Sequence, residues 1–261
     1  EEFCYNGERS WVVGGVIPKK GYEAAYFTRG RNLVLSDTSD MCSPDWGDVY
    51  LAANESWLVS EAGLNLYLAE GKREYIRKDC ERLFLLAVNT EKQGSFMTAF
   101  DDKLSIFYFG EWLKGYFFRS GKTILDALDF SLNEHDRIVS DCEAFDVQLK
   151  ADCEKVGKDY YTIACASLRQ SVAAHKLVET KDGKLLFLSK ENNSNGCIGT
   201  ADVSYPSIPL YLLYDPELVQ GMLRGIYDFA RMPVWNFNFA PHDIGTYPWC
   251  SGQVYGTACR E

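Results

Sequence analysis

The apolar residues of this chain change their spacing once, near Thr123. Before that point, short runs of β-branched and aromatic residues are separated by turn residues, which is typical of strands. These runs are Trp11–Ile17, Asn32–Leu35, Asp48–Ala53 and Ser105–Phe109. After that point, apolar residues recur at helical spacing. We therefore expect an α+β fold with two domains, a β-rich sandwich-like domain over residues 1–118 and a domain of helical hairpins over residues 119–261.

One segment of the first domain is ambiguous. The apolar residues of Gly71–Asn89 lie at a spacing that also suits a helix, so we expect a helix inserted there among the strands.

Two pairs of helices are predicted in the second domain. A capping box over Thr123–Asp126 opens an apolar pattern that runs to Cys153, as one long helix or as two that break near Asn133. A further helix is expected over Asp159–Leu177. The link between these helices is short, which makes them antiparallel neighbours.

The second pair follows a short apolar run at Leu185–Leu188 and a polar loop. Its helices are expected around Tyr205–Tyr214 and over Asp215–Arg231. The sequence Asp215-Pro216-Glu217 supplies an N-cap, a proline at the first helical position and an early acidic residue. One apolar face of the last helix is formed by Leu218, Met222, Ile226 and Phe229. Helix pairs that return through polar loops suit an α-hairpin toroid whose site lies at one end.

Composition narrows the possible partners. The chain has 37 acidic and 27 basic side chains, and its formal net charge of -10 would repel a phosphate backbone, so we expect no nucleic-acid partner. No apolar run is long enough for a transmembrane helix. The nine cysteines have no Cys-x-x-Cys pair, so we expect mostly reduced structural cysteines. The histidines and acidic residues lack the spacing of a metal site, and we expect neither a metal nor a cofactor.

The residues that could carry chemistry gather in the polar loops of the second half. His242 and Asp243 are adjacent in a loop bounded by proline and glycine, and an imidazole titrates near neutral pH. Asp202 and Glu191 could form a carboxylate pair, one activating water and the other assisting departure of the leaving group. The structural alternatives are a turn capped by Asp243, an N-cap at Asp202 and a surface charge at Glu191.

Four further residues are predicted to bind substrate. Asn192 and Thr200 could recognise the carboxylate or amine of an amino acid, and Arg169 could bind a carboxylate through its guanidinium group. Tyr247 lies in the same loop as His242. Arg169 could instead form a salt bridge between helix and loop. Among the other polar residues, Asn195 is expected to form a turn with Gly196, Cys197 to be a weak nucleophile candidate, and His175 to be a hydrogen-bonded core residue.

Three stretches of this half resemble a known family. Ser189 through Asp202, the run Tyr211–Glu217 and the loop Ala240–Pro248 resemble the six-hairpin catalytic domain of glutaminase A-type proteins. Residues from about 120 to 261 resemble the opening portion of that domain, and residues 1 to about 115 resemble the latter part of the β-sandwich domain that precedes it. The resemblance implies an (α/α)6 toroid that hydrolyses L-glutamine to L-glutamate and ammonia.

The chain departs from this family in extent. A six-hairpin toroid needs on the order of twelve helices, and the residues after 120 have room for about four to six. Either the chain is a fragment, or a shorter relative exposes a groove where the family would close a barrel. We expect the first, an incomplete toroid that is a fragment of a secreted or cell-envelope hydrolase acting on a small molecule. Two alternatives remain open: a glycoside hydrolase with Glu191 and Asp202 as its acid pair, since hairpin toroids host such enzymes as well, and a binding module without catalysis.

Overall fold

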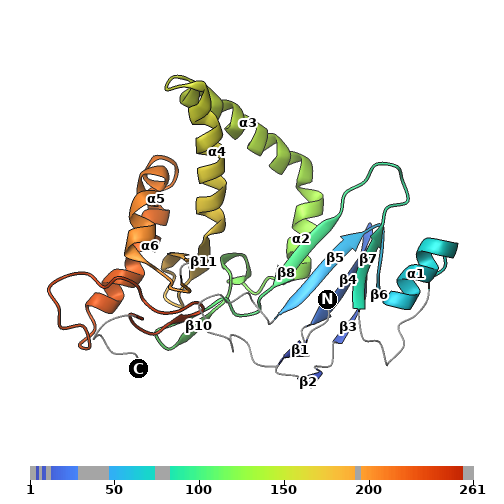
Figure 1. Ribbon diagram of the computed structural model, residues 1–261, viewed down its shortest axis with the longest axis horizontal. Helices are drawn as coiled ribbons and strands as arrows, with labels where there is room; N and C mark the ends of the chain where they lie inside the picture. The colour runs from blue at the N-terminus through green and yellow to red at the C-terminus, as the bar shows by residue number, and fades with distance from the viewer. Residues whose placement is uncertain are drawn as a thin grey trace. The chain divides into compact units, whose positions relative to one another are not determined.

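The computed structural model describes residues 4–5, 8–9, 13–28, 47–73, 83–191 and 195–254. Contacts divide the chain into two compact units. The first unit comprises Glu1–Ser36 and Pro44–Lys103, and the second comprises Asp37–Ser43 and Leu104–Glu261. Both strands and helices are present, so the α+β class predicted from the sequence is confirmed (Figure 1). The domain boundary between residues 118 and 119 stays a prediction.

The first unit is built on an antiparallel sheet of four strands in the order β3-β4-β5-β8. These strands are β3 (Val13–Lys19), β4 (Tyr22–Thr28), β5 (Asp48–Ala53) and β8 (Met97–Asp101). The side chains of β4 are all buried or half-buried, as expected for a strand with a neighbour on each side in the sheet. Two of the expected strands are thereby confirmed, and the expected run Asn32–Leu35 lies outside the described residues.

Shorter strand pairs complete the first unit. β1 (Cys4–Tyr5) pairs with β2 (Glu8–Arg9), and β6 (Glu55–Ser60) pairs with β7 (Leu83–Val88), both antiparallel. The β6–β7 pair contacts β4 and β5. Helix α1 (Glu61–Glu70) follows β6 directly, and its N-cap Ser60 accepts a hydrogen bond from the Gly63 backbone nitrogen at 3.1 Å.

The helix expected over Gly71–Asn89 is wrong where the structure describes that range. The helix of this region, α1, ends before it, and β7 fills its last part. Phe84 of β7 lies opposite Val59, and Leu86 lies opposite Trp57. A short continuous apolar run has the same pattern in a buried strand and in a helix, and here the partner strand decides the outcome.

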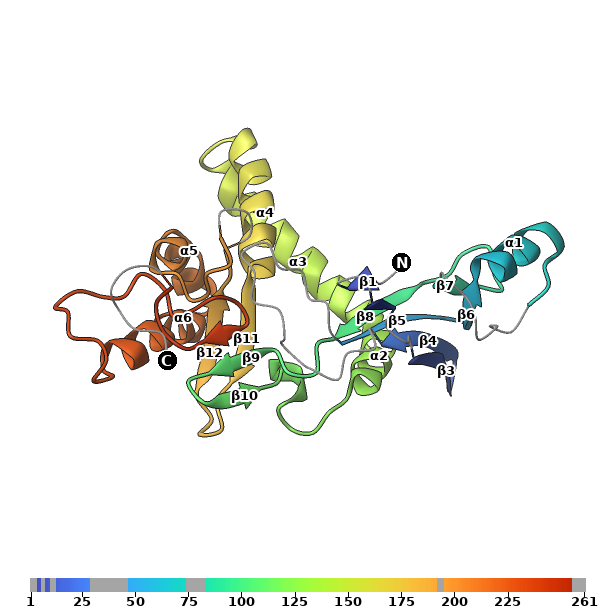
Figure 2. The same ribbon diagram turned by 60° about the horizontal axis from the view of Figure 1, so that its bottom comes forward.

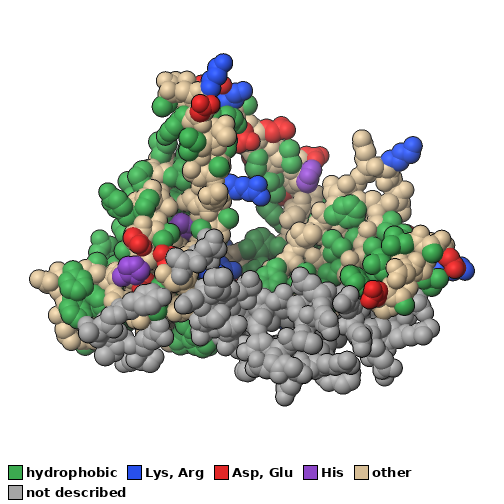
Figure 3. Space-filling model, in the orientation of Figure 1, with side chains coloured by type: hydrophobic (Ala, Val, Ile, Leu, Met, Phe, Trp, Pro, Cys, Tyr) green, Lys and Arg blue, Asp and Glu red, His purple; other side chains and the backbone are tan. Residues whose placement is uncertain are grey.

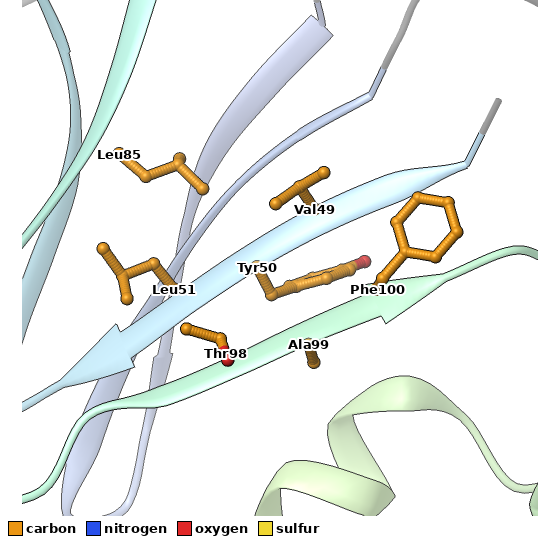
Figure 4. Close-up of a pocket in the computed structure, with 7 residues that line it drawn as sticks. All are labelled: Val49, Tyr50, Leu51, Leu85, Thr98, Ala99 and Phe100. Atoms are coloured by element: carbon orange, nitrogen blue, oxygen red, sulfur yellow. The ribbon is translucent and has the colours of Figure 1, made fainter. Parts of the chain in front are cut away.

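A shallow apolar pocket of about 560 Å³ lies on the first unit (Figure 4). Its lining comes from β5, β7 and β8 and consists of Val49, Tyr50, Leu51, Leu85, Thr98, Ala99 and Phe100. None of these side chains is a carboxylate, an imidazole or a thiol, so the pocket holds no acid–base chemistry near neutral pH.

The second unit begins with a small sheet in the order β10-β9-β13. β9 (Ile106–Tyr108) and β10 (Glu111–Leu113) form an antiparallel hairpin, and β13 (Trp249–Cys250) pairs with β9 in parallel. A 3-10 turn, η1 (Tyr116–Phe118), follows β10. The parallel pair joins the start of the unit to the segment that follows His242.

The first helical hairpin follows the sequence prediction closely. α2 (Ile124–Asn133) opens with the predicted capping box, in which the Thr123 hydroxyl accepts from the Asp126 backbone nitrogen and the Thr123 nitrogen donates to the Asp126 carboxylate. The chain breaks at Glu134, next to the expected break, and continues as α3 (His135–Glu154). α3 packs against α4 (Lys158–Ala173).

The predicted end of α4 at Leu177 is wrong. The helix ends at Ala173, and β11 (His175–Glu179) begins at once, forming an antiparallel hairpin with β12 (Leu185–Ser189). His175 is nevertheless a hydrogen-bonded core residue, as predicted. Its ring stacks on Phe187 at 4.3 Å between centroids, and its Nδ1 donates to the Ser171 carbonyl oxygen at 2.5 Å.

The second hairpin consists of α5 (Ala201–Tyr214) and α6 (Pro216–Ala230). Asp215 caps α6 as predicted by accepting from the Glu217 nitrogen at 3.1 Å. The buried face of α6, with Met222, Ile226 and Phe229, packs on β12 (Figure 2). The close approach uses a glycine, since a Cβ on Gly221 would lie 3.0 Å from the Phe187 backbone nitrogen.

Large apolar side chains remain exposed on the helices α3, α4 and α5. No residue of α4 is buried, and the exposed set on these helices includes Val147, Ile163, Val172, Tyr205, Leu212 and Leu213. Hydrophobic side chains cover much of the visible helical surface (Figure 3). Among the described residues, no helix is both long and apolar enough to cross a membrane.

Candidate active site

The candidate site is built where three segments of the second unit run side by side. Residues 195–200, which join β12 to α5, lie against residues 242–247. The Ile198 nitrogen donates to the Gly245 carbonyl oxygen at 2.8 Å, and the Ile244 nitrogen donates to the Ile198 carbonyl oxygen at 3.0 Å. These hydrogen bonds pair two loops that are far apart in the sequence, in the way that neighbouring strands of a sheet are paired.

Further backbone bonds bring the predicted residues to one place. The Glu191 nitrogen donates to the Cys197 carbonyl oxygen at 3.0 Å, so the chain after β12 joins the same ladder. The Ala201 nitrogen donates to the His242 carbonyl oxygen at 2.8 Å. As a result, Asp202 in the first turn of α5 stands beside His242, and Glu191 lies near enough for its charge to act on the same imidazole.

Ile244 anchors this arrangement from below. Its side chain is fully buried, and glycines make room for it on two sides. A Cβ on Gly199, whose φ is +63°, would lie 2.8 Å from Ile244 Cγ1, and a Cβ on Gly225 of α6 would lie 2.7 Å from Ile244 Cδ1. Because both distances are far below normal contact, larger residues at these positions would displace the loop.

His242 and Asp243 form a direct pair. His242 Nδ1 donates to Asp243 Oδ2 at 3.0 Å, and Asp243 is completely buried. The other carboxylate oxygen, Oδ1, accepts from the backbone nitrogens of Gly245 at 3.0 Å and Val254 at 2.9 Å. Asp243 is therefore held rigidly and fixes the imidazole ring, leaving Nε2 on the opposite side.

The Nε2 atom of His242 points to Asp202. It lies 3.8 Å from Asp202 Oδ1, and both side chains are partly open to solvent, 44% for His242 and 65% for Asp202. The hydrogen bond that His242 donates to Asp243, together with the negative charges of Asp243, Asp202 and Glu191, raises the pKa of His242, against the opposing effect of partial burial. A larger fraction of imidazolium is thus present near neutral pH than in free histidine.

Of the predicted substrate-binding residues that the structure describes, two are buried and one is exposed. Thr200 is fully buried at the N-cap position of α5, and Tyr247 is 3% exposed, with Lys190 Nζ 4.9 Å from its ring centroid. Arg169 is exposed on α4 and makes no ion pair with any described residue. Asn192 lies outside the described residues. The binding roles of these four residues stay predictions.

Some structural alternatives are settled by the contacts. Asp202 is not the N-cap of α5, because Thr200 holds that position and the helix starts earlier than the expected Tyr205. Asn195 forms the predicted turn, accepting from the Cys197 nitrogen at 2.8 Å. Cys197 itself is buried, with 1% of its surface exposed.

Sequence reasoning missed the residues that support the site. Gln253 Oε1 accepts from the His242 nitrogen at 2.7 Å, and the buried hydroxyls of Ser189 and Ser204 lie 3.2 Å apart, linking β12 to α5. No local motif marks these contacts, since each joins distant segments. Cys142, Cys153, Cys165 and Cys250 are free thiols, and the described residues contain no group of three or more acidic, histidine or cysteine side chains arranged for a metal ion.

Comparison with known proteins confirms the resemblance to the glutaminase A-type family. Residues 157–260 match the family model described as the glutaminase A six helical-hairpin domain. The chain is 33% identical over 145 residues to "Glutaminase A" of Aspergillus oryzae, covering 55% of this chain and 20% of that protein. It is 30% identical over 132 residues to "Probable glutaminase/05536" of Arthroderma benhamiae, covering 50% of this chain and 15% of that protein. The chain thus spans a fifth or less of these curated relatives. No solved structure matches it.

Proposed function

We propose that this chain carries part of the active site of a glutaminase-type amidohydrolase, which converts L-glutamine to L-glutamate and ammonia. The names of the two relatives and the family match over residues 157–260 support this substrate. One observation in the structure carries the chemistry: His242 Nε2 and Asp202 Oδ1 face each other 3.8 Å apart, and both side chains are reachable from solvent.

In the proposed reaction, the two groups divide the proton transfers. The Asp202 carboxylate takes a proton from a water molecule as the water oxygen bonds to the amide carbon of the substrate. The imidazolium of His242 then gives its Nε2 proton to the amide nitrogen as the carbon–nitrogen bond breaks, so that ammonia leaves. The raised pKa of His242 favours the acid role, because it increases the protonated fraction near neutral pH.

Asp243 acts as a positioning residue in this proposal. It is completely buried and bonded to two backbone nitrogens, so it cannot touch a substrate directly. Its bond to Nδ1 fixes the ring orientation and stabilises the imidazolium form.

We further propose that α3–α4 and α5–α6 are hairpins of an α/α toroid, and that the sheets of the first unit are part of a β-sandwich. The exposed apolar residues on α3, α4 and α5 support packing against further helical hairpins, since such faces are costly in water. The secreted or cell-envelope location expected from the sequence stays a prediction.

Ammonia release from L-glutamine by the full protein tests the proposed function. Asp202→Asn and His242→Gln should each lower kcat by about 10²- to 10⁴-fold, the usual contribution of general acid–base groups. His135→Gln is the matched control, because His135 is exposed at the start of α3 and pairs with its neighbour Asp136. Hydrolysis of glycosides in place of glutamine, or glutamine binding without turnover, would refute the proposal in favour of the other two classes.

A further inference from the structure

A short segment after β13 returns to the loop that carries the candidate site. The Gly252 nitrogen donates to the Ile244 carbonyl oxygen at 3.0 Å. Two residues further on, the Val254 nitrogen donates to Asp243 Oδ1 at 2.9 Å. We call residues 252–254 the strap, because they hold consecutive residues of the loop in place.

Gln253 supplies a third bond of the strap, and this bond differs from the other two. Its side-chain oxygen Oε1 accepts from the His242 backbone nitrogen at 2.7 Å. The other two bonds use backbone N–H groups, which every residue except proline possesses. The bond to His242 instead needs a side chain that places an oxygen at the length of glutamine. One substitution can therefore remove this bond and leave the rest of the strap intact.

The backbone of His242 is held at both of its polar groups. Its nitrogen is bonded to Gln253, and its carbonyl oxygen accepts from the Ala201 nitrogen at 2.8 Å. Ala201 is the first residue of α5 and directly precedes Asp202. These two bonds therefore help to set the separation of 3.8 Å between His242 Nε2 and Asp202 Oδ1. A displacement of about 1 Å in a reacting group can lower a rate by about 10²-fold.

We propose that Gln253 is a positioning residue that holds His242 opposite Asp202 for proton transfer. This inference rests on the proposed function. Gln253 acts through the backbone of His242 and needs no contact with the substrate. The bond lies near the surface, so in the absence of the glutamine oxygen a water molecule can bond to the His242 N–H without fixing the loop. Loss of this oxygen should therefore lower activity more than it lowers stability.

The protonation of His242 reports how firmly its ring is held. The hydrogen bond to Asp243 on the same loop raises the pKa of His242, and so do the negative charges of Asp243, of Asp202 on α5 and of Glu191 after β12. When the backbone of His242 is no longer fixed, the bond to Asp243 weakens, and the pKa of His242 should fall toward its ordinary value of about 6.5. A purely structural role of Gln253 away from His242 would not change this titration.

Two variants of the full protein separate the oxygen from the rest of the side chain. Gln253→Met keeps the length and removes the oxygen, so kcat for ammonia release from L-glutamine should fall about 10- to 100-fold. KM should change little, and NMR titration should show a lower pKa for His242. Gln253→Glu keeps an oxygen acceptor and adds a negative charge, so it should retain most of the wild-type kcat and raise the pKa of His242. Gln148→Met is the matched control, since Gln148 is exposed on α3 and bonds to Asp152.

An unchanged kcat or an unchanged titration of His242 in Gln253→Met overturns the inference. Equal losses of kcat in both variants also overturn it, because the oxygen is then not the group that matters. If Gln253→Met does not fold, the glutamate variant decides: a retained kcat with a raised pKa supports the inference, and an unchanged pKa overturns it. If the pKa of His242 moves in opposite directions in the two variants while the wild type releases no ammonia, Gln253 holds His242 as inferred and the proposed function fails.

Discussion

Replacing Asp243 by asparagine isolates one interaction of the candidate site. Asp243 is completely buried, with Oδ2 bonded to His242 and Oδ1 bonded to two backbone nitrogens. Asparagine has the same shape, so its carbonyl oxygen can keep both backbone bonds while its amide group faces the imidazole. The change therefore removes the charge-assisted bond to His242 and little else.

The loss of unfolding free energy in Asp243→Asn follows from that single hydrogen bond. A hydrogen bond to a charged group contributes about 1.5–3 kcal/mol, and the partly exposed ring places the value near the lower end, about 1.5 kcal/mol, because solvent screens it. Asp243→Ala is the more severe variant, since it also leaves two backbone N–H groups without acceptors, at about 1–3 kcal/mol each where they are buried.

The sign of the pH dependence is fixed by the raised pKa of His242 in the folded protein. The stabilisation from the imidazolium is fully present below the unfolded value of about 6.5 and is lost as pH rises through the folded pKa. The difference in unfolding free energy between wild type and Asp243→Asn should therefore be larger at pH 5.5 than at pH 9. Urea unfolding at both values measures it, and NMR titration should show a lower pKa for His242 in the variant. An equal difference at both pH values, or an unchanged titration, would refute the reasoning.

Two further changes test the core and the support of the site. Burial lowers the pKa of His175, so its contribution to stability should fall as pH drops below about 6.5; His175→Phe, which preserves a ring for stacking on Phe187, should flatten this acid dependence in urea unfolding. Gly225→Ala should destabilise the protein by about 1–3 kcal/mol and lower activity, because the added Cβ would press on Ile244 beneath the site. Gly157 has open space around it, so Gly157→Ala should change stability far less in the same denaturation assay.

Local chemistry decided which features could be predicted from the sequence. The capping box at Thr123 and the Asp215–Pro216 start of α6 depend on residues within one turn, and both are found as expected. β7 and the end of α4 depend on distant partners. Residues 83–88 become a strand because β6 lies beside them, and β11 leaves the helical pattern because β12 pairs with it.

The same distinction applies to the candidate site. The His242–Asp243 contact joins adjacent residues, so the sequence could suggest it, although adjacent side chains often diverge. The approach of Asp202 and Glu191 depends on the ladder formed by Ile198 and Ile244, and no periodicity encodes that pairing. The burial of Thr200 and Tyr247 is likewise a property of packing, which their polar groups did not indicate.

The pH dependence of ammonia release from glutamine tests the central claim most directly. With His242 as the proton donor, kcat/KM should fall as pH rises through a pKa above 6.5 that coincides with the value measured for His242 by NMR, and Asp243→Asn should move both downward together. A kcat/KM that rises with pH through the pKa of His242, or that does not change there, would contradict the assignment of His242 as the proton donor.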